Sequence, residues 1–254
     1  MSDMIHWLVQ SLESYPTRSN GVVILDGILH SREQTRFTTL KTEKRRRDWL
    51  LGRWTAKQLV GRVIADQTGA KVPLDTIEIH SGVMGDPIVN CQLSMVNRQL
   101  LTDSSRASIS NLQALVTLSI SHSHSHAFCA LVERADWPLG ADIEQVVPRA
   151  DEFVTDYFTE DEQALVAQAV DGMRSVAVTA VWSAKEAVLK ALHLGLTVDT
   201  RSVACLIEPV TERPLTWTPF TVQCDGSRLS QTPPPLGGWW RTYKDFVLTL
   251  VTET

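Results

Sequence analysis

The sequence predicts an α+β fold made of two halves. Predicted strands and predicted helices come in separate runs along the chain, whereas a doubly wound parallel sheet would alternate them one by one. The two halves have comparable sets of elements, which meet near Trp137. A chain of 254 residues can form two domains of roughly 125 residues each. We therefore expect an N-terminal half of residues 1–136 and a C-terminal half of residues 137–254, with no repeat visible in the sequence itself.

The composition is that of a globular protein from the cell interior. A hydrophobic content of 43% excludes a disordered chain, and the net charge of −5 argues against general affinity for nucleic acid. No apolar run approaches the roughly 20 residues that span a bilayer, and the N-terminus does not resemble a signal peptide. The four cysteines lack CxxC spacing and are predicted to be reduced thiols. We expect a cytoplasmic monomer with no nucleic-acid and no membrane partner.

The N-terminal half is expected to contain short strands around one long helix. In chain order, we expect a short helical segment at 1–12, a buried strand at 21–25, a polar helix from 31 leading into an amphipathic helix over 41–60, strands at 77–79 and 88–89, a loop or weak helix at 94–106, and strands at 114–120 and 127–132. The turn Gly85-Asp86-Pro87 separates the two short strands.

The C-terminal half begins with a strand at 139–144 and continues with helices and further strands. Thr159 stands three residues before Glu162, a spacing that predicts a capping box and a helix through about residue 169. Neither glycine nor proline interrupts residues 173–194, which predicts a second helix. The remaining expected elements are strands at 203–207 and 220–224, a loop at 233–238 and a closing strand at 246–251.

The long helix of the N-terminal half starts in the basic run Lys44-Arg45-Arg46-Arg47. Arg53 and Lys57, four residues apart, extend the basic stripe along the helix. Such a run is often no more than a solvated surface. Four adjacent cations repel one another, however, and they are easier to explain if an anion such as a phosphate binds among them.

Two carboxylates stand together in the strand Gly140-Ala141-Asp142-Ile143-Glu144. Side chains two apart on a strand point the same way, so Asp142 and Glu144 project together, about 6.5–7 Å apart at the backbone. This pair is costly unless a cation lies between the charges, and oxygen ligands of this type suit magnesium. The alternative is a solvent-facing strand edge.

A third carboxylate lies on the predicted helix at 173–194. Trp182, Glu186 and Lys190 are four apart and therefore share one helix face. In the simpler interpretation the indole packs in the core and Glu186–Lys190 is a surface pair worth about 0.3–0.5 kcal/mol. In the functional interpretation Glu186 completes the acidic cluster of Asp142 and Glu144.

The alternation His122, His124, His126 has two interpretations. On one strand the three imidazoles would face the same way, as in a zinc hydrolase. No cysteine or later histidine cluster completes such a site, and the segment lies at the end of a strand. The other interpretation is that one histidine contacts a phosphate and the others are incidental.

Taken together, these motifs resemble the Sfp-type 4′-phosphopantetheinyl transferases. The resemblance is carried, in the order of that family, by Ile120-Ser121-His122-Ser123, by the strand from Gly140 to Glu144, and by Trp182-Ser183-Ala184-Lys185-Glu186-Ala187-Val188-Leu189-Lys190. Leu51-Gly52-Arg53 and the turn at Asp86 also have counterparts, so the resemblance covers most of residues 40–195. Ala141 is a mild departure, and Asp86 stands where that family commonly has lysine.

The resemblance implies a fold of two similar α+β halves related by a pseudo-two-fold axis, with the active site in the cleft between them. The implied reaction is the magnesium-dependent transfer of 4′-phosphopantetheine from coenzyme A to a serine of an apo acyl or peptidyl carrier protein, which releases adenosine 3′,5′-bisphosphate. Three alternatives stay open: a zinc metallohydrolase that uses the His122/His124/His126 strand, a non-catalytic coenzyme A-binding protein of the same fold, and a nucleic-acid module built on the basic helix, which the net negative charge disfavours.

The resemblance also implies roles for individual residues. Asp142, Glu144 and Glu186 would hold magnesium, and Glu186 would act as general base for the serine hydroxyl. Two groups of residues are implied for binding coenzyme A. Lys185 and Lys190 would neutralise the pyrophosphate. The 3′-phosphate end would be held by Ser121, His122, Arg45, Arg47 and Arg53.

Overall fold

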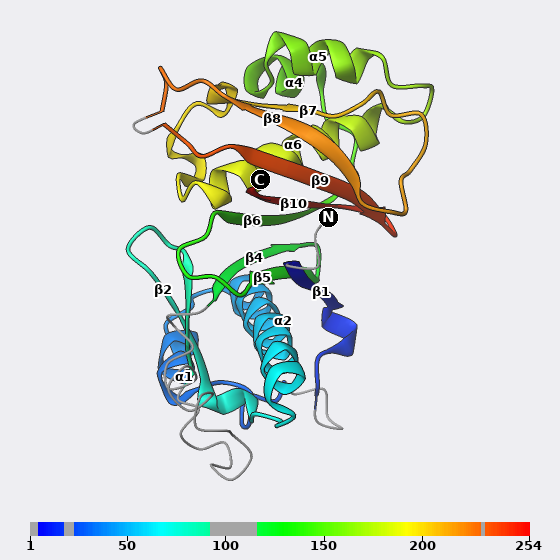
Figure 1. Cartoon of the computed structure of the whole chain (residues 1–254). Coiled ribbons are helices and arrows are strands. Elements are labelled where there is room, and N and C mark those ends of the chain that lie inside the picture. Colours follow the sequence, from blue (N-terminus) through cyan, green and yellow to red (C-terminus); the bar gives the residue numbers. More distant parts are fainter. Residues whose placement is uncertain (1–4, 18–22, 92–115, 230–231) are drawn as a thin grey trace. The chain divides into compact units, whose positions relative to one another are not determined.

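A computed structural model of the chain describes residues 5–17, 23–91, 116–229 and 232–254 (Figure 1). The chain forms two compact units, an N-terminal unit that runs to Trp137 and a C-terminal unit that begins at Pro138. Both combine helices with antiparallel sheet, so the predicted α+β class is confirmed. No helix in the described part of the chain is long and apolar enough to cross a membrane.

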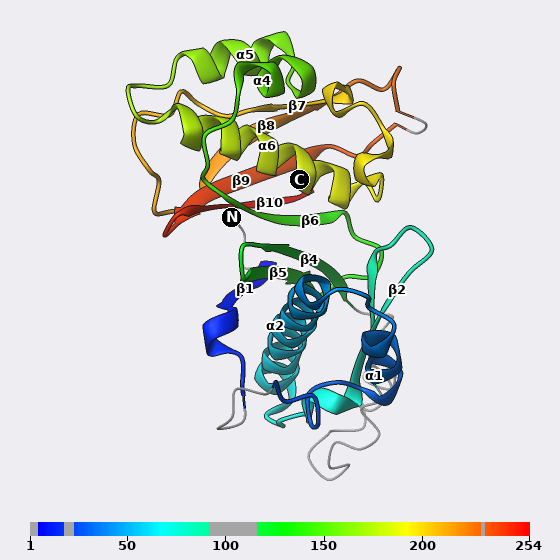
Figure 2. The same cartoon turned by 180° about the vertical axis from the view of Figure 1, so that it is seen from behind.

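The N-terminal unit packs one long helix against a three-stranded antiparallel sheet (Figure 2). Its helices and strands are β1 (Ile5–Ser11), α1 (Ser31–Thr38), α2 (Glu43–Thr68), β2 (Ile77–Ser81), β3 (Pro87–Cys91), β4 (Thr117–Ser123) and β5 (His126–Val132). The sheet order is β1-β5-β4, and β2 and β3 form a separate hairpin. The core lies between α2 and the sheet, where apolar side chains of α2 such as Val60 and Val63 meet Leu131 of β5.

The C-terminal unit packs a second long helix against a five-stranded antiparallel sheet (Figure 1). Its helices and strands are β6 (Leu139–Gln145), α4 (Asp151–Tyr157), α5 (Glu160–Ala167), α6 (Arg174–Ala191), β7 (Val203–Leu206), β8 (Thr218–Cys224), β9 (Leu236–Tyr243) and β10 (Phe246–Glu253). The sheet order is β6-β10-β9-β8-β7, and α6 packs mainly on β6 and β10.

Gly140 lets α6 approach β6 very closely. A Cβ atom at this position would lie 1.8 Å from the backbone carbonyl oxygen of Ala187. Only glycine therefore fits here without moving the helix backbone. The close approach brings the acidic strand β6 against the part of α6 that carries Ser183, Glu186 and Lys190.

The two units share the same order of elements along the chain. Among the described residues, each has a first strand, then a pair of helices that ends in a long helix, then four strands; the C-terminal unit adds α4 before the pair. The order β6-β10-β9-β8-β7 has its counterpart in β1-β5-β4 together with the β3–β2 hairpin, whose strand β3 packs beside β4. The units are therefore two versions of one topology.

A buried lysine holds each unit together in the same way. In the N-terminal unit, Lys57 of α2 forms an ion pair with Glu33, the third residue of α1, whose carboxylate also accepts the backbone N–H of Ile79 in β2. In the C-terminal unit, Lys185 of α6 pairs with Glu162, the third residue of α5, whose carboxylate accepts the backbone N–H of Cys205 in β7. Both glutamates also complete the capping boxes of their helices.

A short repeat surrounds these two lysines, so the expectation that the sequence contains none is wrong. Residues 54–58 read Trp-Thr-Ala-Lys-Gln and residues 182–186 read Trp-Ser-Ala-Lys-Glu, and Arg62 and Lys190 follow at the same spacing. The likeness is hidden because the rest of the two helices has diverged. Gln58 stands in α2 where Glu186 stands in α6.

Several expected elements differ from the structure. Residues 5–11 form the strand β1 rather than a helix, because β1 pairs with β5 more than a hundred residues later. The strand expected at 21–25 is reduced in the described residues to a single bridge between Thr17 and Val23. Residues 236–238 begin β9 rather than ending a loop: Gly238 is in the strand because a Cβ there would lie 2.1 Å from the ring of Phe220. The helix α4 was not expected, and the segment 94–106 lies outside the described residues.

Candidate active site

Asp142 is the buried centre of a polar cluster between β6 and α6. Its Oδ2 accepts a hydrogen bond from the hydroxyl of Ser183 at 2.8 Å, and its Oδ1 lies 2.6 Å from the ammonium of Lys190. Thr249 of β10 donates to Ser183 at 3.0 Å and so fixes the serine. Lys190 also donates to the carbonyl oxygen of Ala141 at 3.2 Å. Strand and helix thus meet through one carboxylate with both oxygens occupied.

Glu144 and Glu186 belong to the same electrostatic cluster. Burial, and then the negative charges of Asp142 and Glu186, raise the pKa of Glu144 to about 7, although Arg149 and Lys190 oppose the shift. Burial and the charge of Asp142 likewise raise the pKa of Glu186. The three carboxylates predicted from two separate motifs therefore repel one another within one site.

Arg149 lies beside this cluster, held on aromatic rings. Its guanidinium is 4.4 Å from the ring centroid of Phe153 and 5.8 Å from that of Trp182. One terminal nitrogen lies 3.7 Å from Oε2 of Glu144, and the buried Nε has no hydrogen-bond partner. Tyr157 completes the aromatic group, with its ring centroid 5.4 Å from that of Trp182. Arg149 was not among the predicted site residues, because nothing in its spacing from Glu144 indicates that the loop folds back.

The donor types of the cluster fit a magnesium ion, which prefers carboxylate oxygens. The repulsion that raises the pKa of Glu144 and of Glu186 is what a divalent cation would relieve. Their arrangement is nevertheless not that of a preformed metal site: within the described ranges, no three His, Cys, Asp or Glu side chains are placed to hold a metal. In this structure Lys190 and Arg149 lie against the two strand carboxylates instead.

The structure corrects the expectation that Lys185 binds the pyrophosphate of coenzyme A. Its side chain is fully buried, with Nζ 2.8 and 2.6 Å from the two carboxylate oxygens of Glu162. A third bond, at 2.6 Å, goes to the carbonyl oxygen of Val203. All three hydrogens of the ammonium are used inside the unit. Lys185 is adjacent to Glu186 in sequence and therefore points to a different side of the helix.

The three alternating histidines do not share a strand, so the premise of the zinc alternative is wrong. His122 is exposed on β4, which ends at the next residue. His124 and Ser125 form a two-residue turn with φ values of 43° and 63°, and His126 opens β5. A two-residue hairpin turn with positive φ at both positions reverses the chain. Ser121 is buried on β4, one position before His122.

Two of the three predicted arginines line one cavity of about 420 Å³ in the N-terminal unit, namely Arg45 and Arg53. Arg32 and Arg36 of α1 line the same cavity and were missed, because a helix before the basic run gave no reason to join it to that run. Trp49 and His80 are further lining residues. The cavity therefore gathers four guanidinium groups and the carboxylates of Glu33 and Glu78, and the excess of arginines suits a phosphate.

The rest of the predicted basic stripe faces elsewhere. Arg46 donates to the carbonyl oxygen of Leu40 at 2.8 Å, and Arg47 is exposed and does not line the cavity. Lys57 is buried on Glu33. Arg53 is only 11% exposed, lies 5.0 Å from the ring centroid of Trp49, and has a buried Nε without a hydrogen-bond partner. Burial lowers the pKa of this guanidinium, and the charge of Glu33 opposes that shift.

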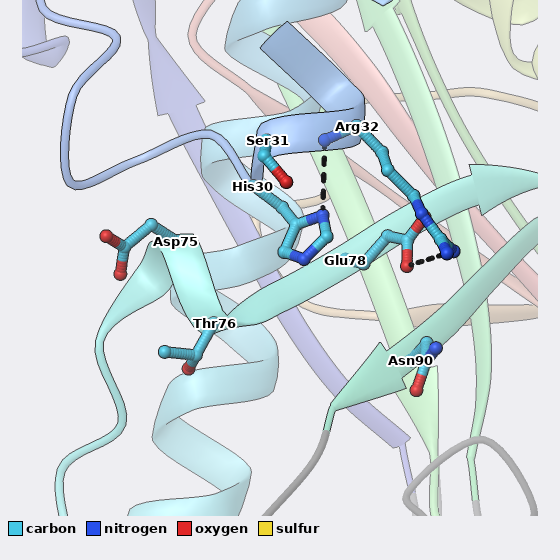
Figure 3. A pocket seen from close by; sticks show the side chains of 7 residues that line it. All are labelled: His30, Ser31, Arg32, Asp75, Thr76, Glu78 and Asn90. Atoms are coloured by element: carbon cyan, nitrogen blue, oxygen red, sulfur yellow. Dashed lines mark hydrogen bonds and ion pairs between the residues drawn. The ribbon is translucent and has the colours of Figure 1, made fainter. Parts of the chain in front are cut away.

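A second cavity, of about 540 Å³, adjoins the first at the start of α1 (Figure 3). Its lining residues are His30, Ser31, Arg32, Asp75, Thr76, Glu78 and Asn90. The guanidinium of Arg32 lies 3.4 Å from Glu78. Figure 3 shows this contact and the Arg32 backbone N–H donating to Nδ1 of His30. Acidic and basic groups are mixed here, and the predicted site residues are not among those that line it.

Comparison with known proteins gives one family. Residues 138–251 match the family model of the 4′-phosphopantetheinyl transferase superfamily. No curated protein matches the chain. This match covers less than half of the chain and lies within the C-terminal unit.

Three solved structures illustrate the likeness. A holo-(acyl-carrier-protein) synthase from Bacillus anthracis in complex with CoA (3′,5′-ADP) is 20% identical over 52% of this chain and 96% of its own, with a TM-score of 0.36. The holo-[acyl-carrier-protein] synthase of Thermotoga maritima is 17% identical over 61% and 74%, with a TM-score of 0.35. The holo-ACP-synthase of Plasmodium yoelii is 15% identical over 51% and 91%, with a TM-score of 0.34.

Proposed function

We propose that the chain moves the 4′-phosphopantetheine group of coenzyme A onto an apo carrier protein, and the match of residues 138–251 to the family model of the 4′-phosphopantetheinyl transferase superfamily supports this. In this reaction a serine oxygen of the carrier forms a bond to the phosphorus that bears the pantetheine. The bond from that phosphorus to the pyrophosphate bridging oxygen breaks, adenosine 3′,5′-bisphosphate leaves, and the serine proton passes to a base. Catalysis of such a transfer depends mainly on positioning and on charge neutralisation.

The observation that carries this proposal is the meeting of Asp142, Glu144, Glu186 and Lys190 between β6 and α6. These four residues come from two motifs about forty residues apart, and the close approach at Gly140 brings the two motifs together. A surface Glu186–Lys190 pair would not account for a buried aspartate bound by the same lysine.

Glu186 is the proposed base. The pKa of its carboxyl is raised by burial and by Asp142, which makes the carboxylate a stronger proton acceptor near neutral pH than an ordinary glutamate. Lys190 would neutralise charge on the pyrophosphate. Magnesium, when bound by Asp142, Glu144 and Glu186, would offset further negative charge on the phosphates. The Ser183 hydroxyl, which Thr249 holds in place, orients the carboxylate of Asp142.

The arginine cavity of the N-terminal unit is the proposed site for the 3′-phosphate end of coenzyme A. Arg45 and Arg53 line it together with Arg32 and Arg36, and Trp49 offers a ring beside the guanidinium of Arg53. Ser121 and His122 are proposed as further contacts to the nucleotide. The proposed partner is an acyl or peptidyl carrier protein, and the chain is proposed to act as a monomer. The proposed location is the cytoplasm, with which the four free cysteines are compatible.

The direct test is mass spectrometry of a panel of apo acyl and apo peptidyl carrier proteins, incubated with this protein, coenzyme A and magnesium. The proposal is supported if a carrier gains one phosphopantetheine group and a variant of that carrier, with alanine in place of the acceptor serine, gains none. Tight binding of coenzyme A without transfer to any carrier would favour the non-catalytic alternative.

A further inference from the structure

Two cations lie against the two strand carboxylates of the cluster. Lys190 Nζ is 2.6 Å from Asp142 Oδ1, and the Arg149 guanidinium is 3.7 Å from Glu144 Oε2. The first distance is that of a short charge-assisted hydrogen bond, whereas the second is too long for a hydrogen bond. Glu144 is thus neutralised by a neighbour that it does not hold tightly.

The aromatic rings, rather than Glu144, hold the guanidinium in place. It lies 4.4 Å from the ring centroid of Phe153 and 5.8 Å from that of Trp182, and the side chain is 23% exposed. Its Nε is buried and has no hydrogen-bond partner. The backbone carbonyl of Arg149 accepts a hydrogen bond from Arg174 at 3.2 Å, which anchors the loop. A guanidinium fixed in this way keeps its position if Glu144 changes partner.

We propose that Arg149 is a further pyrophosphate-binding residue, paired with Glu144 until a divalent cation takes that carboxylate. The inference rests on the proposed function, because the pyrophosphate is that of coenzyme A. With a metal ion on Glu144, the guanidinium would be available to a phosphate of the pyrophosphate, because its fork of N–H donors matches phosphate oxygens. Arg149 therefore competes with the metal in the absence of coenzyme A and cooperates with it in its presence.

This exchange predicts opposite effects of one substitution. Without coenzyme A, Arg149→Met removes a competitor for Glu144, so the metal should bind at least as tightly as in the wild type. With coenzyme A, the same substitution removes a contact to the phosphate that the metal also holds. The cooperativity between metal and coenzyme A should then fall, because the coupling between two ligands is the factor by which each changes the affinity for the other.

The experiment measures Mn²⁺ binding, by electron paramagnetic resonance of the free ion, with and without saturating coenzyme A and in the absence of any carrier protein. Mn²⁺ stands in for Mg²⁺ because both accept carboxylate and phosphate oxygens. The ratio of the two dissociation constants is the coupling factor. We expect Arg149→Met to lower this factor by roughly tenfold without weakening Mn²⁺ binding to the protein alone.

Arg201→Met is the matched control, because Arg201 is an exposed arginine of the same unit, paired with Asp199 at 3.0 Å. It should leave both constants unchanged. If Arg149→Met does not fold, Arg149→Lys and Arg149→Gln take its place. The lysine variant keeps a charge and should retain more of the coupling than the glutamine variant.

An unchanged coupling factor in the Arg149 variants would overturn the inference. Weaker Mn²⁺ binding to Arg149→Met in the absence of coenzyme A would also overturn it, since that would mean that the arginine only orients Glu144 for the metal. A wild-type protein that binds no coenzyme A would overturn the proposed function and this inference with it. If the wild type binds coenzyme A and the Arg149 variants show the same coupling factor as the wild type, the role of Arg149 is contradicted and the proposed function is kept.

Discussion

The ammonium of Lys185 lies 2.6 Å from Oε2 of Glu162, with neither side chain exposed to solvent. The pair joins α6 to the first turn of α5, and Glu162 extends the link to β7 through the Cys205 N–H. Lys57 and Glu33 make the same link between α2, α1 and β2 in the N-terminal unit. Lys185 is therefore structural, and its neighbour Glu186 is the residue proposed for chemistry.

We expect Lys185→Met to destabilise the protein by about 3–5 kcal/mol, because the change leaves the buried carboxylate of Glu162 without its cation. The measurement is chemical denaturation of the variant and the wild type. The double variant Lys185→Met/Glu162→Gln is expected to be less destabilised than the sum of the two single variants. If the Lys185→Met protein had normal stability but bound coenzyme A poorly, Lys185 would instead be a residue that binds the pyrophosphate.

Gly140→Ala should also destabilise the protein, by about 1–3 kcal/mol or more, because the added methyl group meets the helix backbone at Ala187. Gly61→Ala is a matched control on α2, where the nearest atom to an added Cβ is 3.8 Å away. Alanine is a better helix former than glycine, so this second change should stabilise by up to about 1 kcal/mol. Thermal melting of both variants checks the two opposite signs. Equal effects would contradict the close contact of β6 and α6.

The arginine cavity predicts a difference between two arginines of one basic run. Arg45 lines the cavity and Arg47 does not. Arg45→Met should weaken coenzyme A binding by roughly tenfold, the loss expected for a hydrogen bond to a charged group. Its effect on dephospho-coenzyme A, which lacks the 3′-phosphate, should be smaller.

Arg47→Met should leave both affinities close to those of the wild type. Calorimetric titration with the two ligands makes the comparison. Equal losses in the two variants would mean that the run acts as a diffuse basic surface rather than through the cavity.

Glu144 predicts a dependence of stability on pH in the metal-free protein. Its pKa is raised from the ordinary 4.5 to about 7, so the folded state holds the proton more tightly than the unfolded state does. Stability therefore falls as the pH rises through that interval, since the carboxylate must ionise beside Asp142. Glu144→Gln removes this contribution, and the variant should gain stability relative to the wild type between pH 5 and 8.

Melting curves at several pH values, with chelator present, measure this gain. A difference between the two proteins that does not change with pH would contradict the electrostatic description of the cluster. Added magnesium should stabilise the wild type at the upper end of the range more than it stabilises Glu144→Gln, because the variant lacks one carboxylate ligand.

Residue spacing was enough to predict most of the candidate site. Asp142 and Glu144 share a strand face because they are two apart, and Glu186 and Lys190 share a helix face because they are four apart. Spacing did not reveal that Lys185 is buried on Glu162, because that depends on the packing of α5 against α6.

The parts that sequence reasoning missed depend on contacts between distant segments. Arg149 reaches the cluster through a loop that folds back onto Phe153 and Trp182, and no periodic pattern describes such a loop. The strand β1 is defined by its pairing with β5 rather than by its own sequence. In β9, Gly237 and Gly238 suggested a turn, although Gly238 serves to admit the ring of Phe220.

The role of Glu186 as general base is tested most directly by the rate of transfer by Glu186→Gln, read from the mass of an apo carrier protein that the wild type modifies. Loss of a general base alone costs about 10²–10⁴-fold, so turnover at saturating magnesium should fall by at least that factor while the fold is kept. Glu160→Gln, an exposed glutamate of α5, is the matched control and should work at the wild-type rate. A Glu186→Gln protein that works within a few-fold of the wild type would contradict the account and leave Glu186 and Lys190 as a structural pair.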